Sequence, residues 1–328
     1  MSARARAALE EIDAIRRGDR QAMAKAITLL ESKRPEKAEQ GRAILDELVP
    51  HTGQSMRVGV TGPPGVGKSS FIESLGIYLL ERGHRVAVLA VDPSSPVTGG
   101  SILGDKTRMD RLAQQERAFI RPSPSGGSLG GVAERTREAM LICEAAGYDV
   151  VIVETVGIGQ SEISVRSMVD FFLVLLQPGA GDELQGIKKG VLELADTLVV
   201  NKADGVQLEA ADRCVGDHSR ALSLLHAQSA NWTPRVLSAS ALEGTGIDEV
   251  WQTILEHTAA LESSGERRAR RREQARAWMW SLVEEGLRES FRAHPAVADR
   301  IESLEREVQN LEKTPAAAAR SLLETFQR

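Results

Sequence analysis

The strongest constraint on the fold is a glycine-rich segment at residues 62–69, with the sequence GPPGVGKS. It matches the pattern GxxxxGK[ST], follows a β-rich run at 57–61 and precedes a run with helical periodicity. Glycines let backbone N–H groups turn inward around an anion, because side chains would block its approach. The segment therefore predicts a strand, a phosphate-binding loop and a helix, in that order.

This loop is predicted to bind the phosphates of a nucleotide. Lys68 would place its ammonium against the β- and γ-phosphates, and the Ser69 hydroxyl would ligate Mg²⁺. The helix beginning near Lys68 would add the positive end of its dipole. The predicted nucleotide-binding residues here are Gly62, Pro63, Pro64, Gly65, Val66, Gly67, Lys68, Ser69 and Ser70.

Short apolar runs alternate with helical segments between about residues 56 and 261. Strands are expected at 57–61, 86–91, 118–121, 150–153, 171–176, 198–200 and 235–238. Continuous apolar strands separated by helices indicate a mostly parallel sheet that is covered on both faces. The predicted fold class is therefore α/β, of the P-loop NTPase type, with helical extensions at both ends.

Helical patterns without recognisable chemistry flank this region. We expect three domains: an amino-terminal helical extension at 1–54, a P-loop NTPase domain at 55–262 and a carboxy-terminal helical arm at 263–328. The charge run at 267–272 is expected to be mainly a solvated helix face. Contact with an acidic partner or another subunit is the alternative.

The composition argues against several classes of protein. The net charge of −5 is unsuited to coating nucleic acid. Cys143 and Cys214 form neither a zinc spacing nor a disulfide framework, which fits a reducing compartment. No apolar run reaches the ~18 residues of a membrane span. Acidic residues follow Arg4 and Arg6 closely, unlike a transit peptide. We expect a cytoplasmic protein that binds neither nucleic acid nor membrane.

A second motif indicates that the base is guanine. Residues 201–204 read NKAD, which matches NKxD and follows an expected strand. The carboxylate of Asp204 can accept hydrogen bonds from guanine N1–H and N2–H₂, whereas adenine presents a lone pair at N1. Asn201 would brace the loops and the stem of Lys202 would cover the base. Residues Ser240, Ala241 and Leu242 fit the element whose backbone N–H groups meet guanine O6.

Acidic residues between these motifs are candidates for a magnesium site. Residues 154–157 read ETVG, so Glu154 would act through the Mg²⁺ shell and the Gly157 N–H would approach the γ-phosphate. Asp92 ends the second expected strand, at the sheet edge where ligands bind. Asp105 lies in a glycine-rich loop that could act as a switch. A strand-ending turn is the alternative for Asp92, and a plain loop acid for Asp105. The predicted metal ligands are Ser69, Asp92, Asp105 and Glu154.

Together these residues resemble the MeaB/ArgK family of P-loop GTPases. The resemblance covers nearly the whole chain and is carried by residues 62–69, 91–96, 99–109, 154–162, 177–188 and 201–204. It implies a G-protein chaperone of adenosylcobalamin-dependent acyl-CoA mutases, chiefly methylmalonyl-CoA mutase. Such a chaperone gates cobalamin loading and protects the enzyme, and the mutase accelerates GTP hydrolysis. The resemblance also implies a homodimer formed through the carboxy-terminal helices, and a further switch at 177–188 that includes Asp182 and Lys188.

The predicted catalytic residues are Lys68, Asp105, Glu154 and Lys188. Gln160 is the nearest candidate for positioning the attacking water. Without a preorganised catalytic group, intrinsic hydrolysis should be slow, roughly 10⁻³ s⁻¹. Lys188 could supply a partner-dependent cation, and a solvated lysine is its alternative.

Two other functions remain open. The family is similar to nickel-insertion GTPases, but a metallochaperone needs a Cys/His cluster. The histidines are scattered, and we expect no pair of them beside Cys143 or Cys214. A P-loop kinase acting on an amino-acid transport component is the second alternative, although NKxD argues against ATP.

Overall fold

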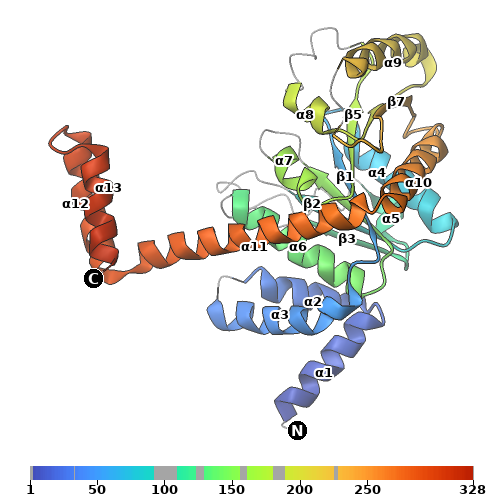
Figure 1. The fold of residues 1–328 in the computed structure, drawn as a ribbon. Helices are drawn as coiled ribbons and strands as arrows, with labels where there is room; N and C mark the ends of the chain where they lie inside the picture. Colours follow the sequence, from blue (N-terminus) through green and yellow to red (C-terminus); the bar gives the residue numbers. More distant parts are fainter. Residues whose placement is uncertain are drawn as a thin grey trace. The chain divides into compact units, whose positions relative to one another are not determined.

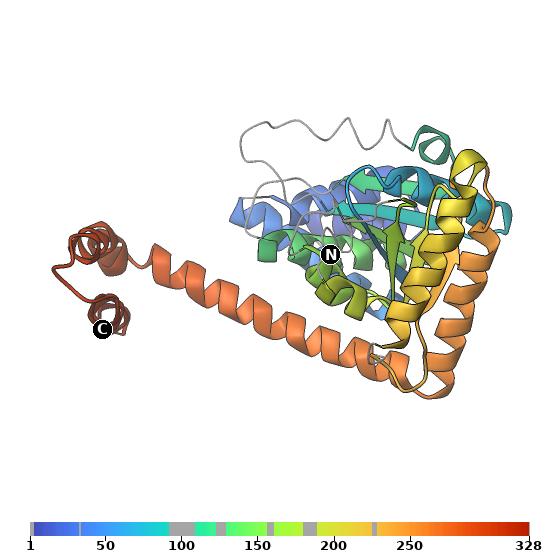
Figure 2. The ribbon, with the colours of Figure 1, turned by 90° about the horizontal axis from the view of Figure 1, so that it is seen from above.

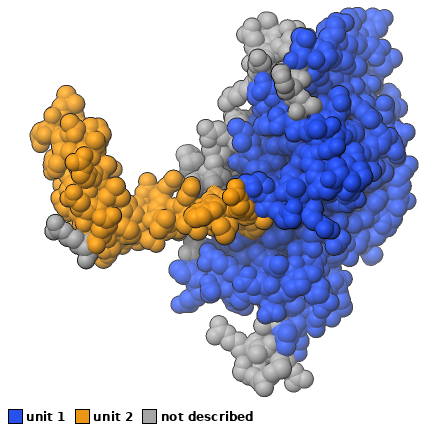
Figure 3. Space-filling view, viewed as in Figure 1, with its two compact units in different colours: residues 1–274 blue, residues 275–328 orange. Residues whose placement is uncertain are grey.

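The computed structural model describes residues 3–32, 34–91, 109–122, 129–155, 161–179, 189–224 and 228–327. The chain forms two compact units, residues 1–274 and 275–328, which Figure 3 colours separately. The division falls within one helix, α11 (Glu266–Ala293). The domain boundaries expected at 54/55 and 262/263 therefore stay predictions.

A parallel seven-stranded sheet forms the centre of the first unit, and it confirms the predicted fold class. The strand order is β3-β2-β4-β1-β5-β6-β7, and each described pair is parallel. The strands are β1 (Met56–Thr61), β2 (Val86–Val91), β3 (Ala118–Pro122), β4 (Val150–Thr155), β5 (Phe171–Leu176), β6 (Thr197–Val200) and β7 (Arg235–Ser238). Every residue of β2, β4, β5 and β6 is buried, as expected of strands covered on both faces.

Helices cover both faces of this sheet (Figures 1 and 2). One face carries α4 (Lys68–Glu81), α5 (Asp110–Ala113) and α10 (Ile247–Ser263), which bury Phe71 and Ile254 against it. The other face carries α6 (Leu129–Ala145), α7 (Ser161–Arg166), α8 (Lys189–Leu194) and α9 (Leu208–Ser223). Apolar strands buried between two helical layers give the sheet its two separate cores.

The amino-terminal helices belong to the first unit. They are α1 (Ala3–Arg16), α2 (Arg20–Leu30) and α3 (Pro35–Leu48), followed by a short 3₁₀ turn at Val49–His51. Asp19 caps α2 by accepting from the backbone N–H groups of Gln21 and Ala22. The buried side chains of Met23 and Ile27 join the core that contains α6. These helices therefore extend one of the two cores.

Arginines of the run at 267–272 in α11 bind a buried carboxylate beside the sheet. Asp170, which precedes β5, is 3% exposed. Arg271 binds it through Nε–Oδ1 (2.7 Å) and Nη2–Oδ2 (2.5 Å), and also donates to the carbonyl of Ser55. Arg267 donates to the same carbonyl, and Arg270 donates to the backbone carbonyl of Asp170. We call Arg267, Arg270, Arg271 and Asp170 the α11 clamp.

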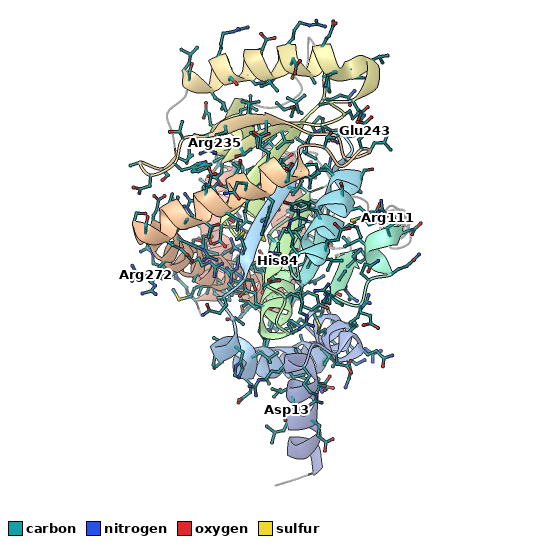
Figure 4. All side chains as sticks on the ribbon, turned by 90° about the vertical axis from the view of Figure 1, so that its right-hand side faces the viewer. Asp13, His84, Arg111, Arg235, Glu243 and Arg272 are labelled. Carbon is teal, nitrogen blue, oxygen red and sulfur yellow. The ribbon has the colours of Figure 1, made fainter. Side chains whose placement is uncertain are left out.

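The clamp corrects the expectation of a mainly solvated helix face. Arg268 and Arg272 are exposed, as that expectation requires, but the three clamp arginines are partly buried. Their spacing of three and four residues places them on one helix face, toward the amino ends of the strands. In Figure 4, Arg272 lies on the side of Arg235, which begins β7, and Glu243 lies on the opposite side.

The second unit contains the remainder of α11 with α12 (Pro295–Gln309) and α13 (Pro315–Phe326). The last two helices pair, and Arg300 donates to the hydroxyl groups of Thr325 and Ser321. Across the described ranges, none of the helices combines the length and apolar character that a membrane-spanning segment requires.

Candidate nucleotide-binding site

The candidate site lies at the carboxyl edge of the sheet. The phosphate-binding loop connects β1 to α4, and β1 lies between β4 and β5. Glu154 is the penultimate residue of β4, Asn201 follows β6, and Ser240 lies just beyond β7. Parallel strands end at the same edge, so motifs more than 100 residues apart in sequence are brought together here.

Glycines in the loop are required by their backbone conformation and by close neighbours. Gly62, Gly65 and Gly67 have φ angles of +152°, +80° and +91°. A Cβ atom at Gly62 would lie 2.7 Å from the carbonyl oxygen of Leu175. One at Gly67 would lie 2.8 Å from Nδ2 of Asn201. The loop is therefore tightly curved and closely packed on its neighbours, which is the backbone form that a cradle of N–H groups around a phosphate requires.

Lys68 and Ser69 lie at the amino end of α4, where the helix dipole favours anions. Nζ of Lys68 donates to the carbonyl oxygens of Gly62 (2.7 Å) and Pro63 (3.1 Å). The Lys68 ammonium thus lies against the phosphate-binding loop itself.

Two oxygen groups converge at the position predicted for Mg²⁺. Ser69 Oγ donates to Oε1 of Glu154 at 3.1 Å, and Glu154 is 7% exposed. The hydroxyl groups of Thr61 and Thr155 lie 2.6 Å apart and tie the ends of β1 and β4 together. A hydroxyl and a carboxylate beside a phosphate cradle are ligands of the kind that Mg²⁺ takes. The residues present therefore fit the predicted ion.

The NKAD segment is braced against the phosphate-binding loop. Nδ2 of Asn201 donates to the carbonyl of Val66 (2.8 Å), and its Oδ1 accepts from the backbone N–H of Ala241 (3.2 Å). One buried side chain thus joins three loops. Lys202 has a φ of +61°, and its Nζ donates to the carbonyl of Gly65 and to Oε1 of Gln177.

The carboxylate of Asp204 is oriented by its neighbours. Ser240 donates its hydroxyl hydrogen to Oδ2 of Asp204, and accepts from the backbone N–H of Glu243 at 3.1 Å. Asp204 is half-buried, whereas Leu242 is 88% exposed. A fixed acceptor at the mouth of the site suits the two N–H donors of guanine.

Several predicted site residues lie outside the described part of the chain: Asp92, Asp105, Gly157, Asp182 and Lys188, together with Gln160. Their roles remain predictions. Sequence reasoning included Gln177 only as the first residue of the predicted switch segment 177–188, and it missed the pair Thr61–Thr155. Each of these residues lies at the carboxyl end of a strand beside or within the site. That position was the signal that could have identified them.

One histidine lies beside a cysteine, which leaves unchanged the expectation that no pair of histidines does so. Nδ1 of His218 lies 3.5 Å from Sγ of Cys214, because the two are four residues apart on α9. Nδ1 also lies 2.9 Å from the carbonyl of Cys214. Two potential ligands do not make a closed metal site. Within the described ranges, no group of three or more His, Cys, Asp or Glu residues is placed to hold a metal.

The fold and site define the class: a P-loop NTPase with the guanine-type base motif of GTPases. The family model described as "Methylmalonyl Co-A mutase-associated GTPase MeaB" matches residues 23–296. The chain therefore belongs to the MeaB family, and it is a GTPase. The resemblance seen in the sequence is thereby confirmed.

Individual relatives agree with this assignment. The chain is 52% identical over 276 residues to GTPase ArgK of Escherichia coli, and the alignment covers 84% of this chain and 83% of that protein. It is 46% identical over 320 residues to the mitochondrial methylmalonic aciduria type A homolog of Mus musculus, covering 94% and 77% respectively. A solved structure described as a LAO/AO transport system kinase is 40% identical, with a TM-score of 0.78 and 98% of both chains covered.

Proposed function

We propose that this GTPase is a chaperone of methylmalonyl-CoA mutase, or of a related adenosylcobalamin-dependent acyl-CoA mutase. It would gate the loading of adenosylcobalamin and protect the mutase during turnover. The observation that carries this proposal is the match to the mutase-associated GTPase family over residues 23–296. The similarity to a methylmalonic aciduria type A homolog supports the same partner.

In this proposal the cradle binds GTP through the loop N–H groups and the amino end of α4. The ammonium of Lys68 moves from the carbonyls of Gly62 and Pro63 to the β- and γ-phosphate oxygens. Asp204 accepts from guanine N1–H and N2–H₂, and the Lys202 stem covers the ring. Discrimination against adenine follows because the carboxylate would meet a lone pair.

Magnesium is the proposed cofactor. Ser69 and Glu154 would hold it, with Asp92 and Asp105 as the further predicted ligands. When bound, the ion would supply positive charge that neutralises the negative charge developing on the phosphates during transfer. The Thr61–Thr155 contact joins the end of β4 to the end of β1, and this supports the proposed role of Glu154.

Hydrolysis is proposed to be slow alone and faster with the mutase. Phosphoryl transfer depends on positioned water and on charge stabilisation. Asp105, Asp182 and Lys188 are the groups proposed to complete the site once the partner binds, with Lys188 as the added cation. The Gly157 N–H would contact the γ-phosphate, and this contact would be lost when the γ-phosphate is hydrolysed.

The chaperone is also proposed to be a cytoplasmic homodimer formed through its carboxy-terminal helices. Met279, Val283 and Leu287 recur every four residues along α11, so they share one face, and they are 42–59% exposed. Trp280 beside them is 55% exposed. An exposed apolar stripe of this kind favours a helical partner.

The test is adenosylcobalamin loading into apo-mutase, followed by the absorbance of the corrin. We expect loading to differ between GTP and GDP, and a Lys68→Ala variant to abolish the difference. Loading that is identical with either nucleotide would refute the proposal. Labelled γ-phosphate recovered on protein or substrate, rather than in water, would favour the kinase alternative. Stoichiometric Ni²⁺ binding in equilibrium dialysis would favour the metallochaperone.

A further inference from the structure

Lys202 has an unusual backbone conformation for a residue with a side chain. Its φ of +61° is in the left-handed region, shared among the described non-glycine residues only with Leu311. Such a conformation is costly and persists where surrounding contacts hold it. Nζ of Lys202 donates to the carbonyl of Gly65 at 2.6 Å and to Oε1 of Gln177 at 3.1 Å.

These two contacts lay the lysine stem across the phosphate-binding loop. A Cβ atom at Gly67 would lie 3.9 Å from Cε of Lys202, so the stem is in van der Waals reach of the loop. One acceptor, the Gly65 carbonyl, belongs to the loop itself. The other, Gln177, is a side chain outside both nucleotide motifs.

The position of Gln177 follows from the sheet order. It comes directly after β5, which pairs with β1 on one side and β6 on the other. β1 leads into the phosphate-binding loop and β6 into NKAD, so Gln177 lies between the two loops. The backbone N–H of Asn201 also donates to the Leu176 carbonyl at 2.9 Å, which fixes the neighbouring backbone.

The chemistry of this contact has a fixed direction. An ammonium can only donate, so the carboxamide oxygen of Gln177 must face it. Gln177 is half-buried, and hydrogen bonds to charged groups are stronger than those between neutral groups. Removing the oxygen leaves the Lys202 ammonium with one acceptor and more freedom to swing away from the loop.

We propose that Gln177 is a positioning residue for guanine recognition. It acts through Lys202, and holds the lysine stem where it covers one face of the base. In this proposal Gln177 contacts Lys202 rather than the base or the phosphates. This inference rests on the guanine site proposed above, and not on the mutase partner, so its test uses the isolated full-length protein.

The first experiment measures the affinity of three variants for GDP and GTP by competition with a fluorescent guanine nucleotide. Gln177→Met removes the oxygen and keeps the length of the side chain, and we expect both dissociation constants to rise roughly tenfold. Gln177→Glu keeps an acceptor and should bind within about threefold of the wild type. Gln252→Met, on the exposed surface of α10, is the matched control and should bind as the wild type.

The steady-state kinetics separate positioning from a general structural effect. In Gln177→Met, KM for GTP should rise roughly tenfold, whereas kcat should change less than about threefold. Thermal unfolding of each variant serves as the check on folding. Unchanged nucleotide affinity in a folded Gln177→Met protein, or an equal loss in Gln177→Glu, would overturn the proposal.

A double-mutant cycle tests whether Gln177 acts through Lys202. Because the contact is lost in Lys202→Met, adding Gln177→Met should weaken GDP binding by less than about twofold further. If Gln177→Met costs the same factor in both backgrounds, Gln177 does not act through Lys202 and the proposal fails. If Lys202→Met alone leaves affinity unchanged, the guanine site itself is wrongly assigned, which distinguishes that failure from the first.

Discussion

Replacing Arg271 by alanine should destabilise the first unit strongly, because it removes the main partner of a buried charge. Asp170 is 3% exposed, and Arg271 makes two hydrogen bonds to its carboxylate, at 2.7 and 2.5 Å. The same guanidinium donates to the carbonyls of Gly53 and Ser55. The variant would leave all of these acceptors with fewer donors.

The magnitude follows from the partners that remain. Breaking a buried ion pair on one side costs about 3–5 kcal/mol. Asp170 keeps the backbone N–H of Arg57 at 3.0 Å and a longer contact with Arg267 at 3.5 Å. We therefore expect Arg271→Ala to lower the free energy of unfolding by an amount at the lower end of this range, about 3 kcal/mol. With a urea m-value near 3 kcal/mol/M, the unfolding midpoint should fall by about 1 M.

The pH dependence provides a second check. Burial alone would raise the pKa of Asp170, but the hydrogen bonds and charge of Arg271, with the charges of Arg267 and Arg57, outweigh it and lower the pKa. The stability from this pair is thus present above the unfolded pKa of about 3.9, and is lost as pH falls through the lowered value. In Arg271→Ala, burial dominates and the carboxyl protonates at higher pH. The difference between the two proteins should therefore shrink as pH falls from 7 toward 4.

The assay is urea unfolding followed by circular dichroism, with Arg272→Ala as the matched control. Arg272 is its exposed neighbour on α11, so its replacement should change stability by less than about 0.5 kcal/mol. Equal midpoints for the Arg271 and Arg272 variants would refute the clamp, and would restore the solvated helix face as the correct description.

Three further variants test other parts of the account. Burial, followed by the nearby Glu134 carboxylate, raises the pKa of Glu138 to about 7, so the folded chain prefers the protonated acid. Glu138→Gln should therefore raise stability by about 2–3 kcal/mol at pH 8 and little at pH 5, and the same gain at both pH values would contradict this. Asp204→Asn should weaken GTP binding by at least ~100-fold and favour xanthosine triphosphate, because an amide N–H can donate to the xanthine C2 oxygen. Competition binding measures this, and retained GTP preference would exclude Asp204 as the base reader. Ser69→Ala should remove most of the gain in GTP affinity that Mg²⁺ provides, measured by titrations with Mg²⁺ and with EDTA. An unchanged gain would exclude Ser69 as a ligand.

The strands of the sheet could be predicted because each is a short run with an apolar centre and a turn or helix signal on either side. β5 reads FFLVLL and is buried throughout. A strand made only of apolar residues predicts burial on both faces of the sheet. The glycine-rich loop was equally readable, because its conformation requires glycine at fixed positions such as Gly67.

The contacts that sequence reasoning missed join residues far apart in the chain. Nothing near residue 271 indicates that its partner is Asp170, about 100 positions earlier, and an arginine run on a helix is ordinarily solvated. Gln177 begins the segment 177–188 that carries the family resemblance, but its contact with Lys202 could not be predicted because it depends on β5 lying between β1 and β6. The contact between Cys214 and His218 was local, and the spacing of four could have indicated it.

The most direct test of the proposed function is the rate of GTP hydrolysis with and without methylmalonyl-CoA mutase. If the partner completes the site, kcat should rise by at least roughly tenfold at saturating mutase. It should not rise with a cobalamin enzyme from outside the acyl-CoA mutases. The same turnover rate in the presence and absence of the mutase would contradict the proposal that this GTPase serves that enzyme.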